Sequence, residues 1–331
     1  MPHSFKLSRR IARFRAPVAA ALLLSLVACN SADSFNADSF NPDPSTTDPV
    51  DPGPVLTDDG DVMLAPAGGP ELAAGFAGGI PIGTFAMPTS AFGSLYNGAL
   101  RTIGPTPLIS ELSAIRARGG KIVLMMAGPQ KHYRNADGSF SLTEWKARIN
   151  RYRNVNFSSF INDGTVIAHY LLDEPYDAHN FGGKPVSGST LEEMARHSKS
   201  IWPNLKTVVR AEPYEIKWSG TYRHLDAAWA QYLSRKGKVS DYIQKNVSTA
   251  KQMGLGLIVG LNIVHGGSPN GTWMTPSEVE NWGTALLSSD YPCAFVSWQY
   301  NSSKLSSSSM KEAMSRLRRK AESRPSRSCS G

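Results

Sequence analysis

The stretch TVIAHYLLDEP, residues 165–175, decides the fold. Its central run, Val166 to Leu172, is mostly apolar and lacks the alternation of polar and apolar residues that a half-exposed strand shows. Such a run is typical of a parallel strand that is covered on both faces of its sheet. Two acids, Asp173 and Glu174, and then Pro175 follow it directly. The sequence therefore predicts a buried strand that carries two carboxylates at its carboxyl end.

Similar apolar runs recur along the chain and alternate with amphipathic segments. The runs cover residues 80–87, 95–101, 121–128, 165–173, 206–212, 227–233, 256–264 and 294–300, and the second of them is short. Repeated strand–helix units form parallel sheets with right-handed crossovers. Seven or eight units in about 250 residues match an α/β protein of the (β/α)8, or TIM, barrel type. An open doubly wound sheet is the alternative, but it favours a glycine-rich phosphate loop after its first strand, and none follows residue 87.

Helix start signals lie between these runs. Ser or Thr stands three residues before Glu at 141–144, 190–193, 275–278 and 309–312, and this spacing permits reciprocal capping of a helix N-terminus. Further helices are predicted at 107–119 and 238–253, each followed by glycine. We therefore place one barrel domain at residues 78–322, followed by a basic tail at 323–331.

The N-terminal residues have the pattern of an export signal. Residues 1–28 combine five basic side chains with an apolar stretch that is short for a membrane span. The sequence Leu26-Val27-Ala28-Cys29 resembles the lipobox of bacterial lipoproteins, which implies a lipid on Cys29 and a membrane-anchored protein of the bacterial cell envelope, exported to the periplasm or the cell surface. A plain secretory signal with an unrelated cysteine is the alternative. Residues 29–77 are acidic and rich in Pro and Ser, so we interpret them as a disordered tether.

The rest of the chain is basic. Residues 66–331 carry 30 Lys and Arg against 19 Asp and Glu. Such an excess suits either a polyanionic ligand or a surface that faces an anionic membrane or cell wall. No nucleic-acid-binding module is recognisable, and nothing in the sequence indicates a protein partner.

Chemistry in a barrel of this kind sits at the carboxyl ends of the strands. Aromatic, amide and carboxylate side chains gather at the predicted ends, and this mixture is typical of sugar binding, although single aromatics could also fill the core. The candidates are Tyr96, Asp173, Glu174, Arg210, Glu212, Trp229, Gln231, Asn262, His265, Trp298 and Gln299.

The string LLDEP on a fourth barrel strand resembles the Asn-Glu-Pro signature of a large clan of barrel glycoside hydrolases, and the ending Trp298-Gln299-Tyr300 of the last strand is also similar. The resemblance implies that Glu174 is the general acid/base and that Asp173 stands in the sugar-binding position. That clan places a nucleophilic Glu after the seventh strand, where this chain has Asn262. Glu212 is then the predicted second carboxyl for cleavage of a glycosidic bond in a poly- or oligosaccharide.

Three alternatives remain open at this level. The reaction could be inverting, the protein could bind glycans without cleaving them, or it could be structural. Asp173 or Glu174 could also cap a loop or pair with Arg210 instead of reacting. The sequence lacks HExxH and HxH spacings and a GxSxG elbow, so we predict no metal, no cofactor and no serine nucleophile.

Two cysteines remain in the barrel and its tail. Cys293 begins the last strand, and the last helix runs back so that Cys329 ends near the same end of the barrel. Topology therefore predicts a Cys293–Cys329 disulfide, with a free Cys329 as the alternative.

Overall fold

The computed structural model describes residues 79–269 and 271–331, so the predicted signal peptide, lipidated Cys29 and tether lie outside the described residues. The described chain forms a closed barrel of eight parallel strands, and each strand pairs with the next until β8 returns to β1. The prediction of a (β/α)8 barrel is therefore confirmed. The strands are β1 (Ile82–Phe85), β2 (Gly98–Thr102), β3 (Lys121–Met125), β4 (Val166–Asp173), β5 (Thr207–Arg210), β6 (Ala227–Tyr232), β7 (Gly256–Leu261) and β8 (Pro292–Ser297).

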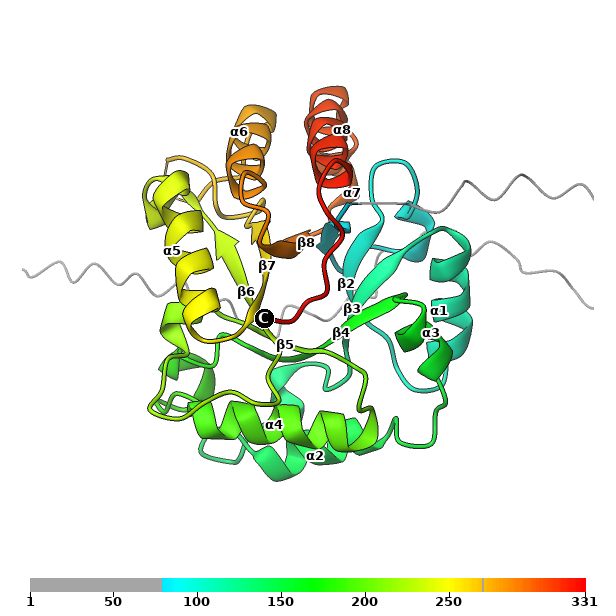
Figure 1. The fold of residues 1–331 in the computed structure, drawn as a ribbon, viewed down its shortest axis with the longest axis vertical. Coiled ribbons are helices and arrows are strands. Elements are labelled where there is room, and N and C mark those ends of the chain that lie inside the picture. Colours follow the sequence, from blue (N-terminus) through cyan, green and yellow to red (C-terminus); the bar gives the residue numbers. More distant parts are fainter. Residues whose placement is uncertain (1–78, 270) are drawn as a thin grey trace, which may run out of the picture. The chain divides into compact units, whose positions relative to one another are not determined.

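Helices surround this barrel (Figure 1). They are α1 (Leu108–Ala117), α2 (Leu142–Asn150), α3 (Ser158–Asn162), α4 (Gly188–Ile201), α5 (Val239–Gln252), α6 (Pro276–Leu286), α7 (Ser302–Leu305) and α8 (Ser308–Glu322). Two crossovers, between residues 85 and 98 and between residues 210 and 227, carry only the short 3-10 helices η2 (Thr89–Ala91) and η5 (Pro213–Glu215). Further 3-10 helices are η3 (Gln130–Tyr133), η4 (Ala178–Phe181) and η6 (Ser234–Lys236).

The helix caps agree with the sequence at two of the four predicted places. Thr275 and Glu278 cap α6 reciprocally, and the Ser141 hydroxyl accepts a hydrogen bond from the Glu144 N–H at the start of α2. The predictions for 190–193 and 309–312 are wrong, since α4 is capped by Ser187 and α8 by Ser307. Helix α4 begins three residues and α8 two residues earlier than predicted, because the hydroxyls of Ser187 and Ser307 accept hydrogen bonds from the N–H groups of Thr190 and Met310.

Apolar side chains form two separate cores. Phe85, Leu100, Tyr170, Trp229 and other residues that face the barrel axis fill its interior. A larger cluster packs the outer face of the strands against the helices. Every strand therefore contributes to both cores, which explains why the runs are apolar throughout.

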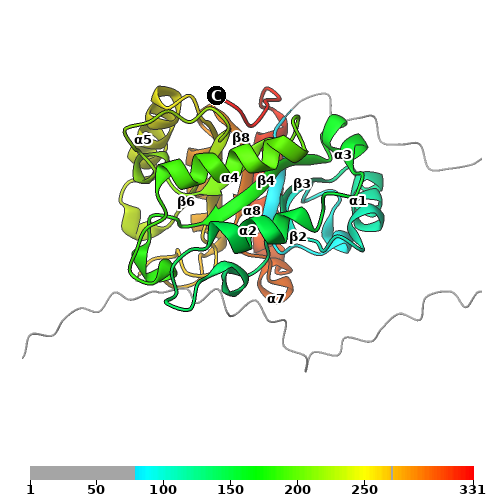
Figure 2. The ribbon, with the colours of Figure 1, turned by 90° about the horizontal axis from the view of Figure 1, so that it is seen from below.

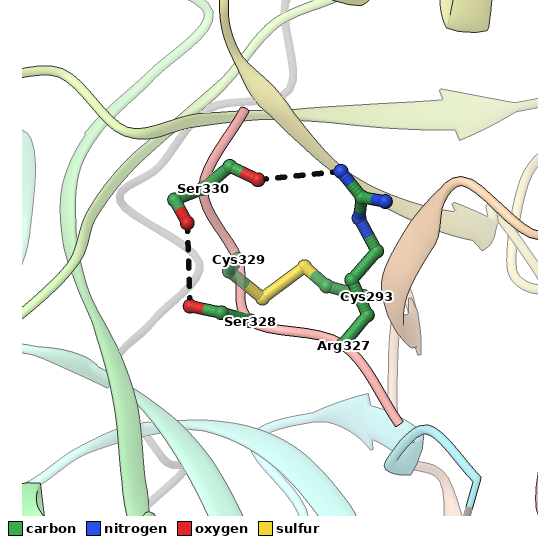
Figure 3. The surroundings of a disulfide bond; sticks show 5 residues. All are labelled: Cys293, Arg327, Ser328, Cys329 and Ser330. Carbon is green, nitrogen blue, oxygen red and sulfur yellow. Dashed lines mark hydrogen bonds between the residues drawn. A yellow bond between two sulfur atoms is a disulfide. The ribbon is translucent and has the colours of Figure 1, made fainter. Parts of the chain in front are cut away.

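The C-terminal tail closes the amino end of the barrel. A disulfide joins Cys293 at the start of β8 to Cys329, the pair that topology suggested, and both cysteines pack into the interior core (Figure 3). An Arg324 guanidinium N–H donates to the Leu287 carbonyl at 2.6 Å. Figure 2 shows the C-terminus and α7 at opposite ends of the barrel. The tail therefore leaves the carboxyl ends of the strands open to solvent and ligands.

Within the described residues, no helix combines the length and the apolar character that a membrane crossing requires.

Candidate active site

The carboxyl end of β4 contains a β-bulge that sets the direction of its acids. Tyr170 pairs with Val208 and Asp173 pairs with Arg210, so β4 uses one more residue than β5 between these two pairs. Leu171 and Leu172 consequently both pack in the outer core, while Tyr170 and Asp173 both face the barrel mouth. The Tyr170 hydroxyl donates to Asp173 Oδ1 at 2.8 Å.

Arg210 at the end of β5 holds both acids of β4. Its Nε bonds Asp173 Oδ1, and its Nη2 lies 2.6 Å from Glu174 Oε1. Burial by itself would lower the pKa of Arg210, but the two carboxylates outweigh this effect and raise it well above the ordinary value. The three side chains keep 14 to 27% of their surface exposed, so they form an ion triad that a ligand can reach from the mouth.

Glu174 occupies an unusual backbone conformation. Its φ is +40°, in the left-handed region that residues other than glycine seldom adopt, and its N–H donates to the Arg210 carbonyl at 2.9 Å. Such conformations persist where the surrounding structure holds them, and they cluster at functional sites. The Tyr176 hydroxyl lies 3.4 Å from Glu174 Oε1.

A cavity of about 150 Å³ opens beside the triad, and we call it the mouth cavity. Aromatic rings make much of its wall, and Phe85 and Trp298 stack with ring centres 4.7 Å apart. Burial, and then the Asp173 carboxylate, raise the pKa of both Tyr133 and Tyr170, so both hydroxyls remain protonated donors at neutral pH. The lining residues are Phe85, Thr102, Met125, Gly128, Pro129, Gln130, Tyr133, Tyr170, Asp173 and Trp298.

Glu212 does not share this cavity. Its carboxylate forms an ion pair with Lys236 and accepts a hydrogen bond at 2.9 Å from Tyr242 of α5, a residue of the outer core. Only 4% of the Glu212 side chain is exposed. Glu212 caps η5 and is held by Lys236 and Tyr242, and neither Glu212 nor Glu174 is among the residues that line the mouth cavity, so the expected pairing of the two glutamates stays a prediction.

The sequence analysis did not single out Glu215, which is coupled to Glu212. Burial and a hydrogen bond with Glu212 raise the pKa of Glu215 to about 8, while Glu212, held by Glu215, Lys236 and Tyr242, has a lowered pKa. One proton is therefore shared between two carboxyls at neutral pH, with Glu215 as its main holder. Glu215 stands three residues after Glu212, but the capping-box pattern begins with Ser or Thr, so a search for it would not have found this pair.

Two predicted aromatic contacts belong to the cores. Trp229 is 1% exposed inside the barrel, and its indole N–H donates to the Val296 carbonyl at 3.0 Å. Tyr96 precedes β2 instead of ending it, and it packs in the outer core. Neither side chain lines the mouth cavity, because Trp229 fills the interior below Tyr170 and Tyr96 lies outside the barrel wall.

The other predicted residues lie around the strand ends. Gln231 faces the same side of β6 as Trp229 and is 5% exposed, and within the described chain its Nε2 has no hydrogen-bond partner. Asn262 follows β7 and accepts the His265 N–H at 2.9 Å, which makes it a loop cap, and His265 itself is exposed. Trp298 lines the cavity, and Gln299 follows it in a half-buried position.

Gln130 and Tyr133 complete the site, and the sequence analysis did not select them. They follow β3 in the turn η3, and the Arg134 guanidinium holds Gln130 Oε1 at 2.5 Å. Their polar, aromatic composition directly after a strand was the available signal. Within residues 79–269 and 271–331, no three His, Cys, Asp or Glu side chains lie together in a way that could hold a metal ion.

Comparison with known proteins identifies the fold. No protein-family model matches the sequence, and no curated protein matches it either. A beta-glucanase from Saccharophagus degradans superposes with a TM-score of 0.53 and 12% identity, over 74% of this chain and 88% of that one. A beta-galacturonidase from Eisenbergiella tayi gives 0.51 and 11%, over 73% and 51%. An endoxylanase from Clostridium papyrosolvens gives 0.48 and 11%, over 76% and 75%. At these identities the likeness extends to the fold alone: the chain has a (β/α)8 barrel, and the beta-glucanase and the beta-galacturonidase are similar to it in fold.

Proposed function

We propose that the protein hydrolyses a glycosidic bond in a poly- or oligosaccharide that enters the mouth cavity. One observation carries the proposal: two adjacent carboxyls at the carboxyl end of β4 share Arg210 beside a cavity with an aromatic wall. Sugar rings stack on aromatic faces, and glycoside hydrolysis requires two carboxyl groups near the scissile bond.

The geometry favours Asp173 in place of Glu212 as the second carboxyl. Asp173 lines the cavity, where Arg210 and the Tyr170 hydroxyl hold its carboxyl, and from this position it can stabilise positive charge at the anomeric carbon. We assign to Glu174, whose side chain is 23% exposed, the proton transfer to the leaving oxygen, while a water molecule from solvent adds to the anomeric carbon and gives up its proton. The Phe85–Trp298 stack would orient the sugar ring.

The test is the release of reducing ends from a panel of neutral and acidic glycans. We expect Glu174→Gln and Asp173→Asn each to lower kcat by about 10² to 10⁴-fold, since general acid–base groups contribute that much. Glu111→Gln is the matched control, because Glu111 also pairs with an arginine, Arg101, but lies outside the cavity. Full turnover in both site variants would refute the proposal.

Glycan binding without cleavage is the second candidate. Asn262 favours it, since the end of β7 offers an amide that is already committed to the His265 N–H. Under this function, oligosaccharides would bind to the wild-type protein without any release of reducing ends.

We also propose that the barrel is exported and held at the bacterial envelope by a lipid on Cys29. The supporting observation is the basic and apolar lead of residues 1–28 followed by the lipobox-like residues before Cys29. The acidic segment 30–77 would then connect the anchor to the barrel.

A further inference from the structure

One wall of the mouth cavity carries a cluster of positive charge on its outer side. Gln130 and Tyr133 line the cavity, whereas Lys131 and His132, between them in η3, are exposed. Residues three apart in a 3-10 helix point the same way, so the two inner residues of the turn face away from the cavity. Arg148 of α2 and Arg151, which directly follows that helix, complete the group, and we call Lys131, His132, Arg148 and Arg151 the basic rim.

The two arginines are attached to the segment that leaves β3. Arg148 Nε donates to the Ala127 carbonyl at 2.9 Å, and Arg151 Nη2 donates to the Met126 carbonyl at 3.3 Å. A Cβ placed on Gly128, which lines the cavity, would lie 3.2 Å from Arg148 Nη2. The basic rim is therefore built onto the cavity wall.

The basic rim has no acidic partner in the described part of the chain. The ion pairs there engage other arginines and lysines, and no carboxylate lies within 4.0 Å of a rim nitrogen. Burial and then Arg148, Lys131 and Arg151 lower the pKa of His132, and burial and then Arg151 lower that of Arg148. Like charges held this close repel one another, and a bound anion would relieve the repulsion.

We propose that the basic rim binds the oxyanion groups of an acidic glycan, so that the ligand of the mouth cavity is a polysaccharide with carboxylate or sulfate substituents. A glycan longer than the cavity that leaves it over η3 would pass from Gln130 and Tyr133 on the cavity side to Lys131 and His132 on the outer side. The inference rests on the proposed glycan site, and it assigns part of the basic excess of the sequence to a ligand.

The experiment compares binding of galacturonate oligomers, sulfated galactan oligomers and neutral cello-oligosaccharides by titration calorimetry, at low and at physiological salt. We expect Arg148→Ala/Arg151→Ala to weaken binding of acidic oligomers about tenfold, which corresponds to about 1.4 kcal/mol, and to reduce the salt dependence. The control Arg118→Ala/Arg153→Ala removes the same charge from exposed positions outside the rim and should stay within twofold. The two acidic ligands tell whether carboxylate or sulfate is preferred.

A second variant does not touch the backbone contacts of the arginines. Lys131→Glu reverses an exposed charge in η3, so it should weaken the binding of acidic oligomers and leave the binding of neutral oligomers unchanged. Lys311→Glu on α8 is its control. Equal binding of neutral and acidic oligomers, unaffected by either rim variant, would overturn the inference. So would rim-dependent binding of anionic lipid vesicles without any binding of acidic glycans.

Cleavage assays separate this inference from the proposed function. Turnover of neutral glycans that is insensitive to the rim variants would leave hydrolysis standing and refute the acidic ligand. Rim-dependent binding of acidic glycans without release of reducing ends would refute hydrolysis and support the acidic ligand.

Discussion

At the scale of single residues, the local environment gives similar carboxyls different properties. Asp173 and Glu174 face an arginine and the open mouth, whereas Glu212 and Glu215 share a proton beside Lys236 and Tyr242. The two pairs of carboxyls lie close enough to act on one side chain. Burial raises the pKa of Tyr176, and the charges of Glu174, Glu212 and Glu215 raise it further. The buried pair therefore contributes to the electrostatic field at Tyr176, the residue whose hydroxyl lies beside Glu174.

The Glu215 proton makes the stability depend on pH. In the folded state the pKa of Glu215 is about 8, above its ordinary value of 4.5. Between pH 4.5 and pH 8 the folded state therefore binds more protons than the unfolded state. This contribution is fully present below pH 4.5 and is lost as the pH rises toward 8. The lowered pKa of Glu212 acts oppositely, and its contribution is lost as the pH falls below 4.5.

We expect Glu215→Gln, which keeps a neutral hydrogen-bond donor, to lose less stability than the wild type between pH 5 and pH 8. Urea unfolding at several pH values checks this. Buried histidines such as His169, with a pKa lowered by burial to about 3, change stability with the opposite sign, so the difference between the two proteins is the quantity to compare. Glu312→Gln on α8 is the control. Parallel stability profiles for Glu215→Gln and the wild type would contradict the shared proton.

At the scale of elements, the ends of strands matter more than their middles. Strict alternation from Tyr170 would turn Asp173 to the outside of the barrel, and the bulge at Leu171 and Leu172 turns it back to the mouth. The bulge interrupts the regular hydrogen bonding between β4 and β5, and it buries both leucines in the outer core.

The tail is an element whose attachment can be measured. The Cys293–Cys329 disulfide closes a loop with a sequence separation of 36 residues, so the double variant Cys293→Ala/Cys329→Ala should lower the free energy of unfolding by about 3 kcal/mol. Guanidinium unfolding measures the change. A reductant should destabilise the wild type and leave the variant unaffected; equal midpoints for both proteins without reductant would show that the disulfide contributes nothing.

At the scale of the whole molecule, acidic and basic residues are concentrated in different parts of the chain. Residues 30–77 contain acidic residues but no Lys or Arg, while the barrel sequence has a large excess of Lys and Arg. A basic barrel joined to an acidic segment suits a protein that meets anionic polymers near a surface.

The lipid anchor that we propose on Cys29 predicts where the protein is found. Cys29→Ser should move it from the membrane fraction to the soluble fraction of the source or host cell, because acyl chains contribute about 0.8 kcal/mol per buried CH₂. Fractionation before and after a high-salt wash, with labelling by a radioactive fatty acid, measures this. Wild-type protein that a salt wash releases, or that takes up no label, would show electrostatic attachment instead of a lipid.

The sequence by itself determined the order of strands, the closure of the barrel and the presence of two acids at the end of β4. Runs of apolar residues predict burial on both faces of a strand, and the Thr275–Pro276 pair predicts a helix start. Both features could be predicted because they depend on residues close together in the sequence. The tertiary structure decided which way each terminal side chain points. A bulge directs Asp173 to the barrel mouth, the turn η5 directs Glu212 to α5, and Trp229 packs in the interior core. The sequence pattern could not predict these directions, because they depend on partners far away in the sequence.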